Sequence, residues 1–109
     1  MTREEIAAMV ESIGLPTAYY EFNDNTPQEP PFVCWFFSRD ADFKADDANY
    51  QNIEVLNIEL YTRYKDFELD ATIERILNAN GLVYAKESNK IDAESIWQTS
   101  YESEVIING

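Results

Sequence analysis

The chain has 109 residues, a length that fits one domain spanning residues 1–109, and its 45% hydrophobic residues suffice for a packed core. It carries 21 Asp and Glu against 8 Lys and Arg, a formal net charge of −13. Because binding to a phosphate backbone depends on Lys and Arg, and anionic membranes repel acidic proteins, this charge argues against nucleic-acid and membrane binding.

The N-terminal segment predicts an amphipathic helix. Thr2 and Glu5 have the spacing of a capping box, while Gly14 and Pro16 end the pattern. Acidic residues and the lack of a long apolar run also distinguish this segment from a signal peptide. Four apolar residues recur at helical spacing and form one stripe: Ile6, Met9, Val10 and Ile13.

Residues 17–31 predict a short aromatic strand followed by a long loop. "TAYYEF" (17–22) is β-prone, and "NDNTPQEPP" (23–31) holds three prolines among other turn-forming residues. "FVCWFFS" (32–38) is apolar on both faces. It fits a central strand covered on both sides, or a strand with one face on a helix and the other on a neighbouring subunit.

The segment 38–51 raises the question of a metal loop, because aspartates stand at 40, 42, 46 and 47. A calcium loop of the EF-hand type needs Gly at its sixth position and Glu at its twelfth. Counting from Asp40, those positions hold Ala45 and Gln51, so the pattern fails. We expect a solvated connection anchored by Phe43 and Tyr50.

Residues 50–107 predict a strand, a helix and two further strands. In the strand 50–63 the apolar residues change parity, which predicts a bulge or bend near Val55 and Leu56. Asp66 can cap the helix 65–82, and Gly81 ends it. The last strands are 82–87 and 95–107, with 88–94 as a connection or broken strand. The order α-β-β-β-α-β-β predicts an α+β fold with a mainly antiparallel sheet of about five strands and two helices packed on it.

The residue types that carry most enzyme chemistry are missing. The chain has no histidine, one cysteine (Cys34) and three glycines (Gly14, Gly81 and Gly109), which excludes triads, usual zinc sites and phosphate-binding glycine loops. Cys34 lies in an apolar run, where a small buried role is expected. We therefore expect no catalytic residue, no metal and no cofactor.

Two quoted runs carry a resemblance to a known family. "PFVCWFFSRDADFKADDANYQNIEVLNIELYTRYKDFELDATIERILNANGLVY" and "SIWQTSYE" resemble small tail-completion and tail-terminator proteins of tailed phages and prophages, over residues 1 to about 107. Asp47 stands where the family usually has Asn. The matching residues are Phe43, Ala45, Asp46, Tyr50, Ile58 to Thr62, Lys65, Asp66, Tyr101 and Glu102.

The resemblance implies a structural protein of the virion tail, assembled in the host bacterial cytoplasm. It implies a homo-oligomer, a hexameric ring that caps the tail tube, meets the head–tail connector and lets DNA pass. Closed rings need one patch to meet a different patch on the neighbour. Our candidate interface residues are Pro27, Pro30, Phe32, Trp35, Phe37, Phe43, Asp46 and Tyr50.

Two other functions stay open on the sequence. An acidic DNA-mimic or inhibitor protein would present carboxylates at phosphate-like spacing to a basic partner. A mimic should release its partner as salt rises, whereas a ring subunit should self-associate and tolerate salt. The third reading is a host α+β protein that forms no ring.

Overall fold

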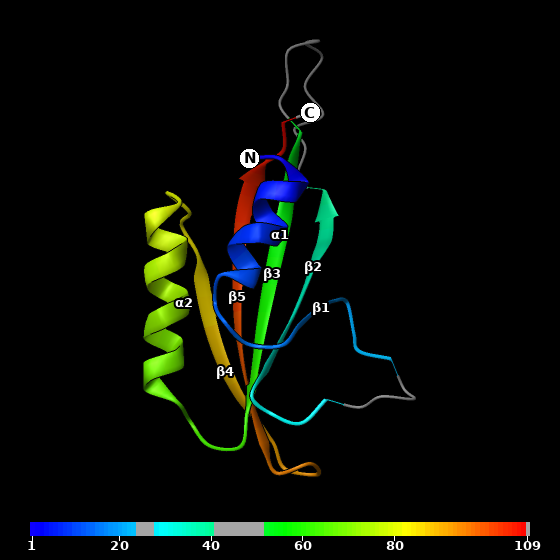
Figure 1. Cartoon of the computed structure of the whole chain (residues 1–109), viewed down its shortest axis with the longest axis vertical. Helices are drawn as coiled ribbons and strands as arrows, with labels where there is room; N and C mark the ends of the chain where they lie inside the picture. The colour runs from blue at the N-terminus through cyan, green and yellow to red at the C-terminus, as the bar shows by residue number, and fades with distance from the viewer. Residues whose placement is uncertain (24–27, 41–51, 109) are drawn as a thin grey trace.

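The computed structural model describes residues 1–23, 28–40 and 52–108, without the side chains of residues 39 and 40. Two helices and five strands follow one another in the predicted order (Figure 1). The helices are α1 (Arg3–Glu11) and α2 (Phe67–Ala79). The strands are β1 (Thr17–Tyr19), β2 (Phe32–Asp40), β3 (Ile53–Thr62), β4 (Ala85–Ile91) and β5 (Ile96–Ile106).

The strands form one sheet in the order β1-β2-β3-β5-β4. β1 runs parallel to β2, and the other three pairs are antiparallel. The predicted α+β class with a mainly antiparallel sheet is thus confirmed. The two edges are the three residues of β1 and the seven residues of β4.

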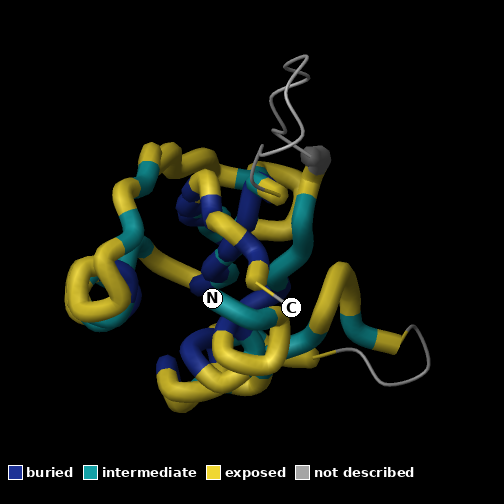
Figure 2. The backbone as a smooth tube through the Cα atoms, turned by 90° about the horizontal axis from the view of Figure 1, so that it is seen from above, coloured by how far each residue is buried: buried dark blue, intermediate teal, exposed yellow. Residues whose placement is uncertain are grey.

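Both helices pack on one face of the sheet. Side chains of a strand alternate between its faces, and the core side chains of each strand share one parity. Viewed from above, the buried stretches lie in the middle of the molecule and the exposed ones around them (Figure 2). The buried core residues are Ile6, Met9, Val10, Ile13, Val33, Leu56, Ile58, Leu60, Ile73, Leu77, Tyr101, Val105 and Ile107.

The helix ends form at the residues that the sequence indicates. Thr2 Oγ1 accepts a hydrogen bond from the Glu5 amide at 3.1 Å, and the Glu5 carboxylate accepts one from the Thr2 amide at 2.8 Å. These contacts to Thr2 lower the pKa of Glu5. Asp66 accepts from the Leu69 amide at 3.0 Å, and Gly81 follows α2 with a left-handed φ of 71°.

The extra residue that we expected in β3 lies in its neighbour β2. β3 pairs with β5 without a break, but the register of β2 shifts between Phe37 and Asp40, opposite Leu56 and Glu54. The predicted bulge position is therefore wrong. β3 keeps a regular alternation because apolar residues occupy both of its faces: Leu56 faces the helices and Val55, 2% exposed, the other side.

The strands β1 and β4 also differ from the prediction. β1 stops at Tyr19 and not at residue 22, because Tyr20 adopts a left-handed φ of 71° while its amide donates to the Trp35 carbonyl. β4 spans Ala85–Ile91 instead of 82–87. Its polar residues gain strand structure from pairing with β5, an influence of tertiary context that outweighs local propensity.

Candidate interaction surfaces

The doubly apolar segment 32–38 places aromatic side chains on both faces of the sheet. Val33, Trp35 and Phe37 pair with core residues of β3 on the helix-covered face. Phe32 and Phe36 have the other parity and are half-buried. β2 is a central strand between β1 and β3, and both helices lie on the face of Val33. Among the described residues, no helix or strand packs on its other face.

An aromatic cluster follows the β1 edge. Tyr19 meets Trp35 edge-on with ring centroids 4.8 Å apart, and Tyr20 stacks on Phe36 at 5.3 Å. Phe37 completes the cluster, 6.1 Å from Trp35. We call these five residues the aromatic edge. Tyr19 is 48% and Tyr20 57% exposed, so much of the cluster faces solvent in a single chain.

A hollow of about 510 Å³ opens beside the aromatic edge on the face without helices. Phe32 and Tyr61 stack in its wall with centroids 4.9 Å apart and planes at 19°, and Phe22 meets Phe32 edge-on. Glu21 and Glu94 also line it. The hollow therefore combines flat aromatic rings with carboxylates.

Two groups in this hollow, the Tyr61 hydroxyl and the Cys34 thiol, have raised pKa values. The Tyr61 hydroxyl donates to Glu59 at 3.0 Å and accepts from Gln98 at 2.9 Å. Burial, and then the Glu59 carboxylate, raise the pKa of Tyr61. Burial raises the pKa of the Cys34 thiol to about 11, with smaller effects of Glu59 and Glu21. A thiol that stays protonated is a poor nucleophile, so Cys34 has the expected packing role.

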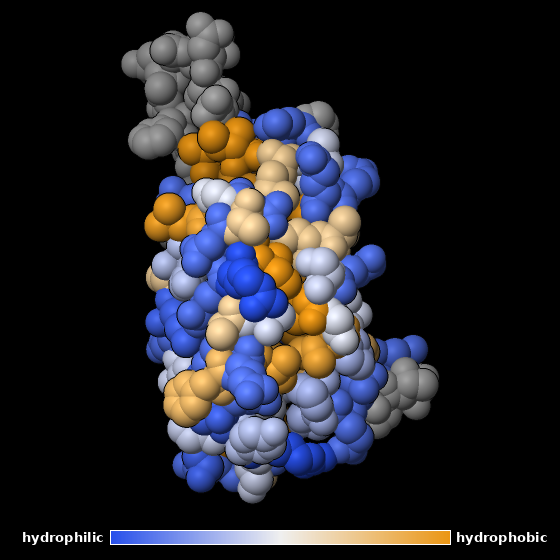
Figure 3. Space-filling view, turned by 60° about the vertical axis from the view of Figure 1, so that its left-hand side comes forward, coloured by the Kyte–Doolittle hydropathy of each residue, from blue (hydrophilic) through white to orange (hydrophobic). Residues whose placement is uncertain are grey.

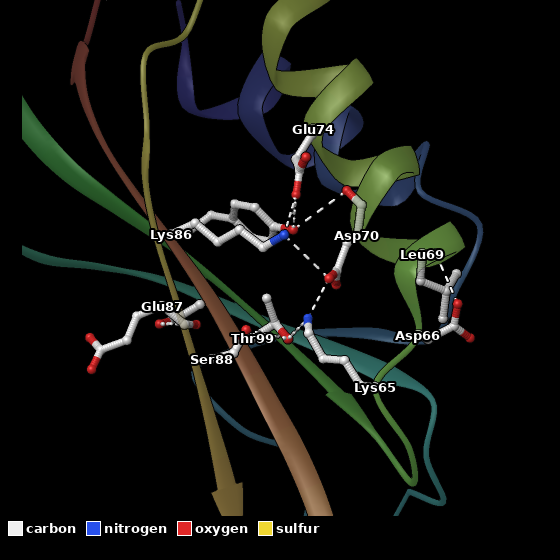
Figure 4. Close-up of polar contacts among 11 residues, drawn as sticks. Lys65, Asp66, Leu69, Asp70, Glu74, Lys86, Glu87, Ser88 and Thr99 are labelled. Atoms are coloured by element: carbon white, nitrogen blue, oxygen red, sulfur yellow. Dashed lines mark hydrogen bonds and ion pairs between the residues drawn. The ribbon is translucent and has the colours of Figure 1, made fainter.

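A charged cluster on the opposite face holds α2 to the sheet (Figure 4). Asp70 is only 3% exposed and bonds to Lys65 and, at 3.3 Å, to Lys86. Lys86 also contacts Glu74 at 2.7 Å, and the Tyr101 hydroxyl donates to the same carboxylate oxygen at 2.8 Å. Since α2, β4 and β5 each contribute residues, the cluster has a structural role.

The pKa values in this cluster shift in the directions that its pairing dictates. The hydrogen bond from Lys86 is the largest cause of the lowered pKa of Glu74, and Tyr101 adds to it. The same bond is the largest cause of the raised pKa of Lys86. Both groups are therefore held in their charged forms.

Four of the eight predicted interface residues are among the residues that the structure describes. Trp35 and Phe37 belong to the aromatic edge, Phe32 lies in the hollow, and Pro30 lines a smaller hollow of about 110 Å³ together with Tyr64. The other four, Pro27, Phe43, Asp46 and Tyr50, lie outside the described residues.

Sequence reasoning missed several exposed aromatic residues. Tyr19 and Tyr20 flank the end of β1, a position that the strand prediction 17–22 concealed. Tyr64 and Phe67, at the start of α2, are 67% and 73% exposed. Apolar side chains also reach the surface in patches on the side that carries α2 (Figure 3).

The described residues hold neither a clustered metal site nor a membrane-spanning helix. Within them, no three His, Cys, Asp or Glu side chains gather in a group that would hold a metal ion. Across the same residues, neither helix has the length and apolar character needed to cross a membrane.

Comparison with known proteins shows the fold. No protein-family model and no curated protein matches the chain. Among solved structures, a chain in the virion of a native gene transfer agent (GTA) particle is similar, with a TM-score of 0.64 at 12% sequence identity. The match covers 94% of this chain and 86% of that one, so nearly the whole α+β architecture is shared with a virion component.

Proposed function

We propose that this protein is a structural subunit of a phage-like particle, not an enzyme, and that it acts as a tail-terminator or tail-completion protein. The observation that carries the proposal is the likeness to a chain of the gene transfer agent virion over 94% of the present chain. The resemblance of the runs around Phe32–Asp40 and Ile53–Thr62 to tail proteins supports the same assignment.

The aromatic edge supplies the contact that a ring needs. A closed ring joins one patch of a subunit to a different patch of the next. Tyr19 and Tyr20 present large apolar surfaces on the outer side of a sheet edge with only three paired residues. Large aromatic side chains often contribute much of the binding free energy of a protein interface. We place this edge at one side of each subunit contact.

The net charge of −13 sets the conditions for assembly. Copies repel one another at low ionic strength, and salt screens this repulsion without weakening apolar contacts. A hexameric ring of such subunits would present negative charge to DNA passing through it, which disfavours adhesion. Tail tube and head–tail connector proteins are the partners in this proposal, and the virion tail is the location.

The test is electron microscopy of the purified protein, alone and mixed with the tail tube protein of the same particle. We expect rings for the unchanged chain. The double variant Tyr19→Ser/Tyr20→Ser should lose them, whereas the control Tyr64→Ser, at a residue that is 67% exposed and outside the aromatic edge, should keep them. Monomers alone under every condition would overturn the proposal. Binding only to basic proteins, without self-association, would favour the DNA-mimic hypothesis.

A further inference from the structure

Among the described side chains, the sheet face without helices carries carboxylates and no lysine or arginine. We call it the open face: the residues of β3, β4 and β5 whose side chains point away from α1 and α2. The strand registers place four carboxylates on it, all exposed or half-buried: Glu59, Glu87, Glu102 and Glu104.

The described lysines and arginines lie elsewhere. Lys86 and Lys90 have the opposite parity on β4 from Glu87 and pair with Tyr101 and Trp97 on the helix-covered face. Lys65 bonds to Asp70 on that face as well. The others are on the helices or at the end of the sheet: Arg3 and Arg75 on α1 and α2, and Arg63, which pairs with Glu29. Among described side chains, then, no cation neutralises the open face.

The carboxylates have the spacing of an extended peptide. Glu102 and Glu104 are two residues apart on β5, so their side chains repeat at roughly 7 Å, the period of alternate residues in any extended chain. Glu59 and Glu87 lie on either side of Ser100, one strand spacing away each. An extended segment along β5 thus meets carboxylates below it and beside it.

The hollow lies at one end of this row. Tyr61 pairs with Gln98 on β5, six residues before Glu104, which puts the two ends of the row roughly 20 Å apart. The stacked rings of Phe32 and Tyr61, next to Glu21, form a site suited to a guanidinium group. Arginine stacks on aromatic faces and pairs with carboxylates more effectively than lysine.

We propose that the open face docks an extended, basic segment of a partner protein, with an arginine in the hollow and further cations over Glu102 and Glu104. A second copy of this chain does not fit, because its own open face has the same sign. Nucleic acid is repelled for the same reason. The proposal does not depend on ring formation.

The experiment measures the anisotropy of a fluorescent nine-residue peptide in 50 mM salt. The peptide has Arg at its second position, Lys at its sixth and eighth, and Ser or Thr elsewhere. A scrambled peptide with the three cations adjacent keeps the charge but not the spacing. We expect the scrambled peptide to bind more weakly than the designed peptide. A peptide with Lys in place of Arg at the second position should also bind more weakly.

A matched pair of variants separates the open face from net charge. The open-face triple Glu59→Gln/Glu102→Gln/Glu104→Gln should weaken peptide binding about tenfold, from small contributions of three charge pairs. The control triple Glu4→Gln/Glu11→Gln/Glu68→Gln removes three exposed carboxylates from α1 and α2, and should have an effect below about twofold.

Peptide binding decides the proposal. Equal loss in the two triples, equal binding of the scrambled peptide, or no binding of the designed peptide would overturn it. Rings that persist in the open-face triple would show that assembly and docking use different surfaces. Salt also distinguishes peptide docking from ring assembly. A higher salt concentration should weaken peptide binding and strengthen self-association. Circular dichroism confirms that both triples are folded.

Discussion

The two faces of the sheet differ in both packing and charge. The helix-covered face buries the core and pairs its cations, with Asp70 between Lys65 and Lys86. The open face has half-buried aromatics at one side and carboxylates without described cations at the other. The described ion pairs that hold α2 to the sheet thus lie on the helix-covered face, and our proposals assign the contacts with other molecules to the second face and its β1 edge.

Replacing isoleucine by alanine should reduce stability far more on the helix-covered face than on the open face. Ile58→Ala removes a side chain that is 2% exposed beneath the helices and should lower the free energy of unfolding by about 3 kcal/mol. Ile106→Ala on the open face, where the side chain is 43% exposed, should cost below about 1 kcal/mol. Urea denaturation measures both. Similar losses would contradict the assignment of the faces.

The next effect tests the charged cluster. Asp70→Ala leaves Lys65 and Lys86 without their shared carboxylate. It should lower the free energy of unfolding by about 3 kcal/mol. This loss is at the lower end of the range for breaking a buried ion pair, because both lysines reach solvent. The control Asp92→Ala removes an exposed carboxylate 3.9 Å from Lys90 and should cost below about 0.5 kcal/mol. If the two losses match, the cluster does not hold α2.

The third effect is a pH dependence of the same cluster. The pKa of Glu74 in the folded protein is below its ordinary value of 4.5. The contribution of Glu74 to the stability of the protein is therefore complete above pH 4.5 and is lost as the pH falls through the folded pKa. The variant Glu74→Gln should be about 1 kcal/mol less stable than the unchanged chain at neutral pH. That difference should shrink toward zero in acid. A difference that stays constant to about pH 3 would refute the pairing.

The paired lysine predicts an alkaline counterpart. The raised pKa of Lys86 means that its contribution is complete below 10.5 and is lost as pH rises through the folded value. Thermal denaturation across this pH range measures it, with Lys86→Met as the variant that removes the dependence.

The smallest effect concerns Cys34 in the hollow. With a pKa of about 11 against an ordinary 9.0, the folded protein has about a hundredfold less thiolate at pH 8 than the unfolded chain. Alkylation by iodoacetamide should therefore be at least that much slower in native buffer than in denaturant. Comparable rates would show that the hollow exposes the thiol and does not bury it.

Most of the fold was predictable from local patterns. The capping box of Thr2 and Glu5, the cap at Asp66 and the left-handed Gly81 are determined by short-range hydrogen bonds and backbone conformation, and they are confirmed. The apolar stripe from Ile6 to Ile13 is buried as its period indicates. Such features depend on residues close in sequence, so a single chain reveals them.

The features that were missed depend on pairing between distant segments. β4 has few strand-forming residues in Lys86–Ile91 and is a strand because β5 lies beside it. The register shift lies in β2, between Phe37 and Asp40, while β3 pairs with β5 without a break. Likewise, the hollow joins Phe22, Phe32 and Tyr61 from separate segments, and no spacing within one segment would have predicted it.

We propose that copies of this protein associate through apolar contacts despite their negative charge. Sedimentation velocity over a range of protein concentrations, at 50 mM and at 500 mM sodium chloride, tests this association. We predict one discrete larger species that grows with concentration and is favoured by the higher salt. A monomer at every concentration, or an oligomer that salt dissociates, would contradict the claim.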